Sequence, residues 1–306
     1  MSQGQHSEYE IPEGVGLTAL IIAQARAVES QRPDRLFDDP FAEEFVAAAG
    51  PAFSTTSEEI ASRLTFQGDY VALRTRFFDD CLLDACQAGC RQVVLLGAGL
   101  DTRAFRLSWP EGVRLFELDL PEVLSFKEDV LATRSATPTC RRVAVGVDLR
   151  EDWARALVAA GFLAEEPTAW LVEGVLMYLT ENERNRLLDR VGELSAPGSR
   201  LALEQRGAGD RERRVLPADP PEPDGSEGSI EQAKKASEEL VARLGVQMNI
   251  GQPDFSMMDP ENWLTRHGWR SRMYSAAERF LFYGRPVPPP METGAVQLWL
   301  ASAERS

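Results

Sequence analysis

The hydrophobic positions of this chain follow two successive patterns. Over about the first 90 residues they recur at helical spacing, as in Leu17, Leu20, Ile21, Ala25 and Val28. Beyond residue 91, short runs rich in Val and Leu alternate with helical segments. These runs predict strands at residues 92–96, 113–118, 142–147, 169–173, 200–204, 269–274 and 297–302.

Helices are predicted between most of these strands, beginning near Asp101, Pro121, Glu151 and Glu181. Further helices are predicted at 67–88, 230–244 and 260–267, and Asp39-Pro40-Phe41 suits a helix start with proline in the first turn. Strands that are apolar throughout, each followed by a helix, indicate a parallel sheet covered on both faces. The predicted fold class is α/β with a Rossmann-like sheet.

The same pattern divides the chain into four parts. Residues 1–90 form a predicted N-terminal helical cap, 91–205 the ligand-binding core, and 263–306 the C-terminal part of the sheet. Residues 206–262 interrupt the alternation and contain an acidic, proline-rich stretch at 217–225. We expect this insertion to form a lid over a substrate pocket; an excursion on the surface is the alternative.

The first predicted strand ends in the turn Gly97-Ala98-Gly99-Leu100-Asp101-Thr102. A glycine turn between a strand and a helix lets the backbone approach a nucleotide-like ligand. Thr102 stands where a dinucleotide fingerprint has its third glycine, and the Asp101 carboxylate would repel a pyrophosphate at the helix start. The turn therefore favours S-adenosyl-L-methionine, a phosphate-free nucleoside with a positive sulfonium, over NAD.

Acidic residues follow three of the predicted strands, at the edge where α/β sheets bind ligands. Asp119 lies about 20 residues after the glycine turn, where a carboxylate accepts both ribose hydroxyls. Asp148 is placed to accept the adenine amino group while Leu149 packs on the ring, and Glu173 lies near the methionine portion. Each acid alone could instead cap a helix; three in register with a glycine turn indicate one binding site.

Composition and charge argue against several classes of binding partner. The net charge of −15 argues against broad binding of nucleic-acid phosphates, and no apolar run approaches the roughly 20 residues that span a bilayer. The polar first ten residues lack the layout of a secretory signal, so we expect a cytoplasmic protein. Four cysteines without a Cys-x-x-Cys pair and only two histidines predict neither a disulfide framework nor a metal site.

Several spaced motifs resemble those of the class I S-adenosylmethionine-dependent methyltransferases of the leucine carboxyl methyltransferase type. This group includes the O-methyltransferases of polyketide pathways, such as the tetracenomycin type. The resemblance spans most of the chain and is weakest over 206–262. The matching segments are 18–20, 26–29, 32–41, 74–79, 96–103, 117–121 and 173–179.

The resemblance implies that Arg74 pairs with the cofactor carboxylate, that Gly97 lines the methionine moiety, and that Glu173 reaches the amino group. Arg26 aligns loosely with a further basic contact. An ordinary surface arginine is the alternative for Arg74. The full set of expected cofactor contacts is Arg74, Gly97, Ala98, Gly99, Asp101, Thr102, Asp119, Leu120, Asp148, Leu149, Glu173 and Gly174.

The acceptor is expected to be a small molecule. A carboxylate is ionised at neutral pH and needs no general base, whereas a phenol benefits from one. Neither His6 nor His267 is well placed as a base, which favours a carboxylate, with a phenolic or enolic hydroxyl as the alternative. Tyr178 is expected to orient the acceptor at the methyl-transfer site, and Arg206 to pair with an acidic substrate; their alternatives are packing and exposure to solvent.

Two other functions remain open from the sequence: an NAD-dependent oxidoreductase and a non-catalytic S-adenosylmethionine-binding protein. The missing third glycine and Asp101 count against the oxidoreductase. A non-catalytic binder would retain Asp119 and Asp148 but lack an acceptor pocket. As to assembly, a monomer and a homodimer are both compatible with the sequence.

Overall fold

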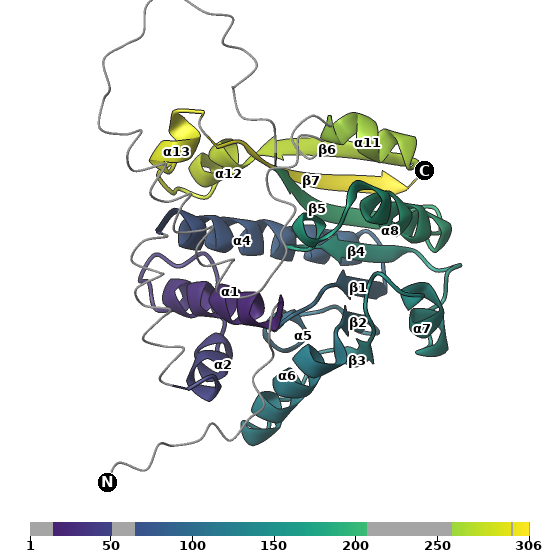
Figure 1. Ribbon diagram of the computed structural model, residues 1–306, viewed down its shortest axis with the longest axis horizontal. Helices are drawn as coiled ribbons and strands as arrows, with labels where there is room; N and C mark the ends of the chain where they lie inside the picture. The colour runs from purple at the N-terminus through teal and green to yellow at the C-terminus, as the bar shows by residue number, and fades with distance from the viewer. Residues whose placement is uncertain (1–14, 51–64, 207–258, 295, 306) are drawn as a thin grey trace, which may run out of the picture.

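The computed structural model describes residues 15–50, 65–206, 259–294 and 296–305. Within this part of the chain, seven strands form one sheet in the order β3-β2-β1-β4-β5-β7-β6 (Figure 1). The strands are β1 (Gln92–Leu96), β2 (Arg114–Asp119), β3 (Arg141–Gly146), β4 (Thr168–Val172), β5 (Arg200–Arg206), β6 (Trp269–Ser275) and β7 (Leu298–Arg305). All seven predicted strands are therefore confirmed, with ends that differ by at most a few residues.

The first five strands are parallel, as predicted. The last strand, β7, inserts between β5 and β6 and is antiparallel to both. The hydrophobic pattern predicted β7 but not its direction, because a buried strand has the same alternation in either direction. In Figure 1 β7 ends at the right beside the C label, so the other strands run toward the left-hand side, where α1 and α5 lie.

Most helices also follow the prediction, with differences of detail, and two short ones, Ala276–Phe282 and Pro289–Glu292, were not predicted. The helix expected from Asp101 is a single turn that begins at Arg103, and the one near Pro40 begins at Ala42, after the proline. The helix predicted at 230–244 lies outside the described residues. The helices are α1 (Val15–Ser30), α2 (Ala42–Ala48), α4 (Thr65–Gln87), α5 (Arg103–Arg106), α6 (Pro121–Thr133), α7 (Trp153–Ala159), η1 (Leu176–Tyr178), α8 (Glu181–Glu193), α11 (Pro260–Arg266), α12 (Ala276–Phe282) and α13 (Pro289–Glu292).

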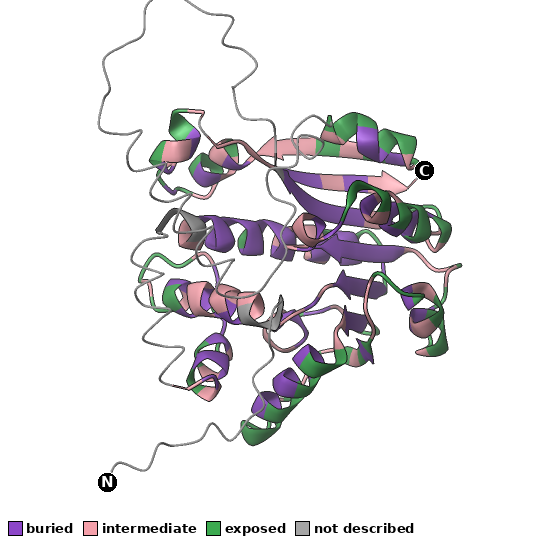
Figure 2. Cartoon of the chain, viewed as in Figure 1, coloured by how far each residue is buried: buried purple, intermediate pink, exposed green. Residues whose placement is uncertain are grey.

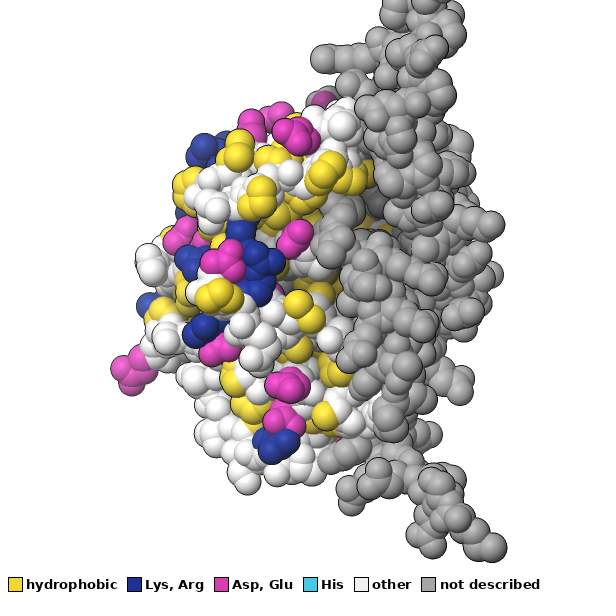
Figure 3. Space-filling view, turned by 90° about the vertical axis from the view of Figure 1, so that its left-hand side faces the viewer, with side chains coloured by type: hydrophobic (Ala, Val, Ile, Leu, Met, Phe, Trp, Pro, Cys, Tyr) yellow, Lys and Arg dark blue, Asp and Glu magenta, His cyan; other side chains and the backbone are white. Residues whose placement is uncertain are grey.

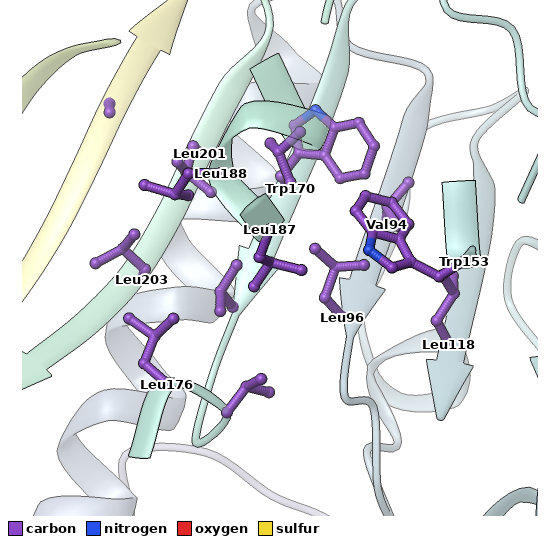
Figure 4. Close-up of a cluster of buried hydrophobic side chains, with 14 of the residues drawn as sticks. Val94, Leu96, Leu118, Trp153, Trp170, Leu176, Leu187, Leu188, Leu201 and Leu203 are labelled. Atoms are coloured by element: carbon purple, nitrogen blue, oxygen red, sulfur yellow. The ribbon is translucent and has the colours of Figure 1, made fainter. Parts of the chain in front are cut away.

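Alternate residues of each central strand enter different cores, which explains why these strands are apolar throughout. In β1, Val94 and Leu96 pack with Trp170 and the helices α7, α8 and α11 (Figure 4). Val93 and Leu95 point to the other face and pack with α4 and α12. Figure 2 shows β1, β4 and β5 buried along their length. Burial on both faces fixes the register of these strands, because a shift by one residue would exchange the two cores.

Glycine turns let the chain leave the carboxyl end of β1 without steric clash. Gly97 has a left-handed backbone, with φ +72°, and a Cβ there would lie 2.3 Å from Cγ2 of Val175. The N–H groups of Gly97 and Ala98 both donate to the carbonyl oxygen of Leu118 at 2.9 Å. Only glycine combines this conformation with this close approach, so the turn holds the ends of β1, β2 and β4 together.

We predict that Gly97→Ala destabilises the protein more than Gly112→Ala does. Gly112 has a similar φ of +81° but nothing within 4 Å of the place that an added methyl group would take, so it reports the backbone contribution alone, about 1–2 kcal/mol. The contact with Val175 adds roughly 1–3 kcal/mol of overpacking at Gly97. Urea unfolding of both variants measures the difference, and equal losses would show that the turn tolerates a side chain.

Candidate active site

Charged side chains from six segments meet in a buried cluster at the carboxyl edge of the parallel strands. They come from α1, α4, α5, the turn after β1, the end of β4 and the end of β5. We call this set the ionic cluster; its members are Arg26, Arg74, Arg103, Arg106, Asp79, Asp101, Glu173 and Glu204. Four cations face four anions. The formal charges therefore balance, as they must when charges are removed from water.

Arg103 is the centre of the ionic cluster and its side chain is fully buried, at 0 % exposure. Its Nε donates to Asp79 at 2.6 Å, its Nη1 to Glu173 at 2.8 Å, and its Nη2 to the carbonyl oxygen of Thr75 at 3.3 Å. Nη1 also pairs with Asp101. Every guanidinium nitrogen is engaged by the protein itself, so Arg103 joins α4 to the ends of β1 and β4.

Glu173 is held as a carboxylate by three arginines. Its Oε1 lies 3.3 Å from Nη2 of Arg26 and 3.1 Å from Nε of Arg74, while Oε2 accepts from Arg103. Burial opposes ionisation of this group, but attraction by Arg103, Arg26 and Arg74 outweighs burial and lowers the pKa of Glu173 to about 2. Glu173 is therefore a fixed negative charge at physiological pH and a poor proton acceptor.

Arg74 and Arg26 differ from Arg103 in keeping a guanidinium nitrogen uncommitted. Arg74 uses Nη1 toward Glu204, at 2.8 Å, and Nε toward Glu173. Arg26 uses Nε toward Oγ1 of Thr75 at 3.4 Å and Nη2 toward Glu173. Within the described residues, neither Nη2 of Arg74 nor Nη1 of Arg26 has a hydrogen-bond partner. Nε of Arg74 and Nε of Arg106 also lack a hydrogen-bond partner in the described part of the chain, but both atoms are buried.

The last two residues of the glycine turn, Asp101 and Thr102, are buried next to Arg103. Asp101 accepts from the backbone N–H of Arg103 at 2.7 Å and from its side chain. Burial opposes ionisation of Asp101, but Arg103 and Arg26 lower its pKa. The neighbouring Thr102 is buried, and its Oγ1 lacks a partner in the described part of the chain.

Asp119 lies at the end of β2, beside the glycine turn. Its Oδ2 accepts from the N–H of Gly99 at 2.6 Å and its Oδ1 from the N–H of Leu120 at 2.7 Å. Burial raises the pKa of Asp119, and these two N–H groups act in the opposite direction. A carboxylate has about four acceptor positions, so two remain for a ligand.

Asp148 and Leu149 follow β3 on the neighbouring side of Asp119, whose carbonyl oxygen accepts from the N–H of Val147 at 2.8 Å. Asp148 accepts from Nε of Arg150 at 2.9 Å, and this hydrogen bond lowers the pKa of Asp148. A methyl carbon of Leu149 lies 3.9 Å from the position of a Cβ on Gly97. The structure thus brings Leu149 to the glycine turn, while Asp148 carries an exposed arginine partner.

Tyr178 lies in η1, the short helix after β4. Its hydroxyl donates to Oγ1 of Thr18 in α1 at 3.1 Å, and burial raises the pKa of the Tyr178 phenol. Arg206 is the last residue of β5, opposite Leu298 of β7. Its side chain lies outside the described residues, as does most of the predicted lid at 206–262.

The predicted cofactor residues therefore fall into two adjoining groups along one sheet edge. Arg74, Asp101 and Glu173 belong to the ionic cluster, whereas Asp119, Leu120 and Leu149 surround the glycine turn. Gly174, with φ +71°, links the first group to η1. Among the described residues, no group of three or more His, Cys, Asp and Glu is placed to hold a metal ion.

Sequence reasoning missed Arg103, Arg106, Asp79 and Glu204 as site components. Glu204 carried a usable signal, because it is an acid at the end of a strand, like Asp119 and Glu173. Asp79 and Arg103 stand inside the motifs 74–79 and 96–103, but only the folded structure shows that they pair at 2.6 Å.

The face toward which the parallel strands run carries side chains of mixed character in its described part. Figure 3 views the molecule from this side and shows acidic, basic and hydrophobic side chains interspersed among the atoms that it colours. No helix in the described part of the chain is both long and apolar enough to cross a membrane.

We predict that the charge of Glu173 makes stability sensitive to acid. Because its pKa in the folded protein, about 2, lies below the ordinary value of 4.5, this contribution is complete above pH 4.5 and is lost as the pH falls toward 2. The loss is on the order of 3 kcal/mol. Urea unfolding at several pH values should show a weaker acid dependence for Glu173→Gln than for the exposed control Glu193→Gln; equal dependence would contradict this account.

Comparison with known proteins assigns the chain to a family. A relative from Parafrankia sp. is 47% identical over 91% of this chain and 84% of its own length. A relative from Streptomyces coelicolor is 44% identical over 92% of both chains. Both are named as S-adenosyl-L-methionine-dependent methyltransferases.

Solved structures agree on the fold. A DUF574 family protein from Streptomyces avermitilis matches with a TM-score of 0.54 and 15% identity, over 94% of this chain and 97% of the other. A protein from Thermobifida fusca, titled as a methyltransferase, matches with a TM-score of 0.51 and 17% identity, over 92% and 94%. The family model described as leucine carboxyl methyltransferase matches residues 19–192, so this chain belongs to the leucine carboxyl methyltransferase family.

Proposed function

We propose that this protein is an S-adenosylmethionine-dependent O-methyltransferase that acts on the carboxylate of a small molecule, such as a polyketide-type intermediate. Family membership and the names of its relatives support S-adenosylmethionine-dependent methyl transfer and argue against the oxidoreductase alternative. The oxygen acceptor and its chemical class are the parts that we propose. The observation that carries the site is the ionic cluster beside Asp119, at one sheet edge.

The residues present fit the cofactor. Arg74 and Arg26 each keep a donor nitrogen for the carboxylate in the amino-acid part of S-adenosylmethionine. Glu173 is the fixed anion for the ammonium group of the cofactor. Asp119 keeps acceptor positions for the ribose hydroxyls, and Leu149 offers an apolar contact to the adenine. Thr102 Oγ1, buried without a described partner, is a further group that a ligand could satisfy.

When bound, S-adenosylmethionine supplies a methyl group that its sulfonium already activates. The protein therefore has to hold the acceptor in line and exclude water, which is a task of proximity and orientation. The hydroxyls of Tyr178 and Thr18, 3.1 Å apart, are candidates to hold an acceptor oxygen. Because burial raises the pKa of Tyr178, its phenol stays protonated and acts as a hydrogen-bond donor rather than a base.

The carboxylates of the cluster favour an acceptor that needs no deprotonation. Asp101 and Glu173 both have lowered pKa values, because the neighbouring arginines stabilise their charged forms, so neither is suited to take a proton from a phenol. His267 pairs with Asp189 at 2.8 Å; His267 directly follows α11 and Asp189 lies in α8, so neither belongs to the cluster. Methylation of a phenolic or enolic hydroxyl is the second candidate, and a non-catalytic binder the third.

The remaining expectations stay predictions: residues 206–262 as a lid, Arg206 as a partner of an acidic substrate, a cytoplasmic location, and a monomer or homodimer. We also keep the division into a helical cap at 1–90, a core at 91–205 and a C-terminal part of the sheet at 263–306. Each concerns location, assembly or segments that lie partly outside the described residues.

We predict that the enzyme consumes S-adenosylmethionine with small carboxylic acids and that the product releases methanol under mild base. An ester releases methanol under these conditions, whereas an aryl ether does not, so a base-stable product would favour the hydroxyl acceptor. No turnover across acids and phenols, despite cofactor binding, would favour the non-catalytic binder.

Tyr178→Phe should lower turnover about 10-fold or more and leave cofactor affinity within about twofold, because the phenol would contact the acceptor and not the cofactor. The matched control is Tyr283→Phe, which removes the hydroxyl that donates to Asp80 at 2.9 Å and should leave turnover unchanged. Steady-state kinetics with calorimetric binding separates the two quantities. Turnover of Tyr178→Phe at the control level would reduce Tyr178 to a packing residue.

A further inference from the structure

Glu204 is a member of the ionic cluster to which the sequence assigned no role. It lies near the carboxyl end of β5, opposite Leu300 of β7, and is 8 % exposed. The strand thus carries a carboxylate into the same edge of the sheet that holds Glu173. A buried carboxylate is costly unless its oxygens are well paired, so its partners indicate what it does.

The two oxygens of Glu204 receive hydrogen bonds from three groups. Oε1 accepts from the N–H of Gly174 at 2.6 Å and from Nη1 of Arg74 at 2.8 Å. Oε2 accepts from the hydroxyl of Tyr70 at 2.7 Å and from the same Nη1 at 3.0 Å. Tyr70 and Arg74 are one turn apart on α4, and the guanidinium carbon lies 5.8 Å from the centre of the Tyr70 ring.

These contacts fix the orientation of Arg74. A guanidinium held at a single point can rotate, but Glu204 binds Nη1 while Glu173 lies 3.1 Å from Nε. Nη1 is hydrogen-bonded to both oxygens of Glu204, and Nε forms an ion pair with Glu173 without a hydrogen bond, so the plane of the group is restrained. Nη2 has no hydrogen-bond partner in the described part of the chain. Nη2 lies 3.5 Å from the Cβ position of Gly174, beside the residues that follow β4.

Glu204 also holds the turn that follows Glu173. Gly174 has a left-handed backbone, with φ +71°, and its N–H would have no described partner without Glu204. This turn leads directly into η1, which carries Tyr178. One carboxylate therefore sets both the donor on Arg74 and the start of the segment that reaches the proposed acceptor site.

We propose that Glu204 is a positioning residue for the cofactor: it holds Arg74 so that Nη2 receives the carboxylate of the amino-acid part. This role rests on the proposed function, because it presupposes S-adenosylmethionine or its product in this site. It acts through Arg74 and not by contact with the ligand. The competing explanation is that Glu204 only neutralises Arg74 and stabilises the fold.

Two ligands distinguish these explanations: S-adenosylhomocysteine, which carries the amino-acid carboxylate, and 5′-methylthioadenosine, which lacks it. Calorimetric titrations of the full chain compare the wild type with Glu204→Gln. We expect Glu204→Gln to lower the affinity for S-adenosylhomocysteine about 10-fold and to leave the affinity for 5′-methylthioadenosine within about twofold of the wild-type value. If the role of Glu204 is purely structural, Glu204→Gln should lower the affinity for both ligands by the same factor.

Glu304→Gln is the matched control. It removes a carboxylate from β7 that pairs with Arg270 at 3.0 Å, at the end of the sheet where β5 begins. We expect it to leave both affinities unchanged. Thermal unfolding of each variant shows whether the protein remains folded at the temperature of the titration.

A double-mutant cycle tests whether Glu204 acts through Arg74. In an Arg74→Met background, Glu204→Gln should cause no further loss of S-adenosylhomocysteine affinity, because the group that it positions is gone. Full additivity of the two losses would contradict the proposal, as would wild-type affinity of the single variant or equal losses for both ligands.

If Glu204→Gln does not fold, Tyr70→Phe decides the question, since it removes only the hydroxyl that donates to Oε2. It should show the same preferential loss of S-adenosylhomocysteine, by about two- to fivefold, and no preference would overturn the role of Glu204. A wild-type protein that binds neither ligand would instead show that the proposed function itself is wrong.

Discussion

The pairing of the buried Glu173 carboxylate with three arginines is the constraint on which the rest of this structure depends. Charges removed from water are tolerated only when each has a partner of opposite sign and its hydrogen bonds are satisfied. Arg26, Arg74 and Arg103 come from α1, from α4 and from the start of α5, so all three segments must dock correctly before Glu173 can be buried. The sheet supplies the edge, and the charge balance determines how the N-terminal helices close over it.

The arginines of this cluster are of two kinds. In one kind the protein engages every guanidinium nitrogen, and in the other kind one Nη nitrogen has no described partner. Arg103 uses every guanidinium nitrogen inside the protein and has no exposed surface. Arg74 and Arg26 share the Glu173 carboxylate with Arg103, yet each keeps one Nη nitrogen that no described residue engages. A site built in this way is preorganised, because its donors are already oriented and need little rearrangement when a zwitterionic ligand arrives. We therefore propose that the cluster serves both as part of the scaffold and as the binding site.

The sequence predicted those features that depend on local periodicity. Short runs of apolar residues predicted β1 and its neighbours. The acids at strand ends located Asp119 and Glu173, since the carboxyl ends of parallel strands meet at one edge. What it did not predict depends on contacts between distant segments. The Glu204–Arg74 pair joins residues 130 positions apart, and the direction of β7 is set by its antiparallel pairing with β5 and β6. The local sequence around Arg26 likewise does not distinguish it from a surface arginine, and only the fold brings it to Glu173.

The most direct measurement of the central claim is a crystal structure of the protein with S-adenosylhomocysteine. This account predicts the amino-acid carboxylate on Nη2 of Arg74, the ammonium beside Glu173 and the ribose hydroxyls on Asp119. It further predicts that Arg103 keeps its partners in Asp79, Thr75 and Glu173, because none of its nitrogens is available to the ligand. An amino-acid end bound away from the ionic cluster, or an arrangement in which the ligand displaces Arg103 from Glu173, would contradict it.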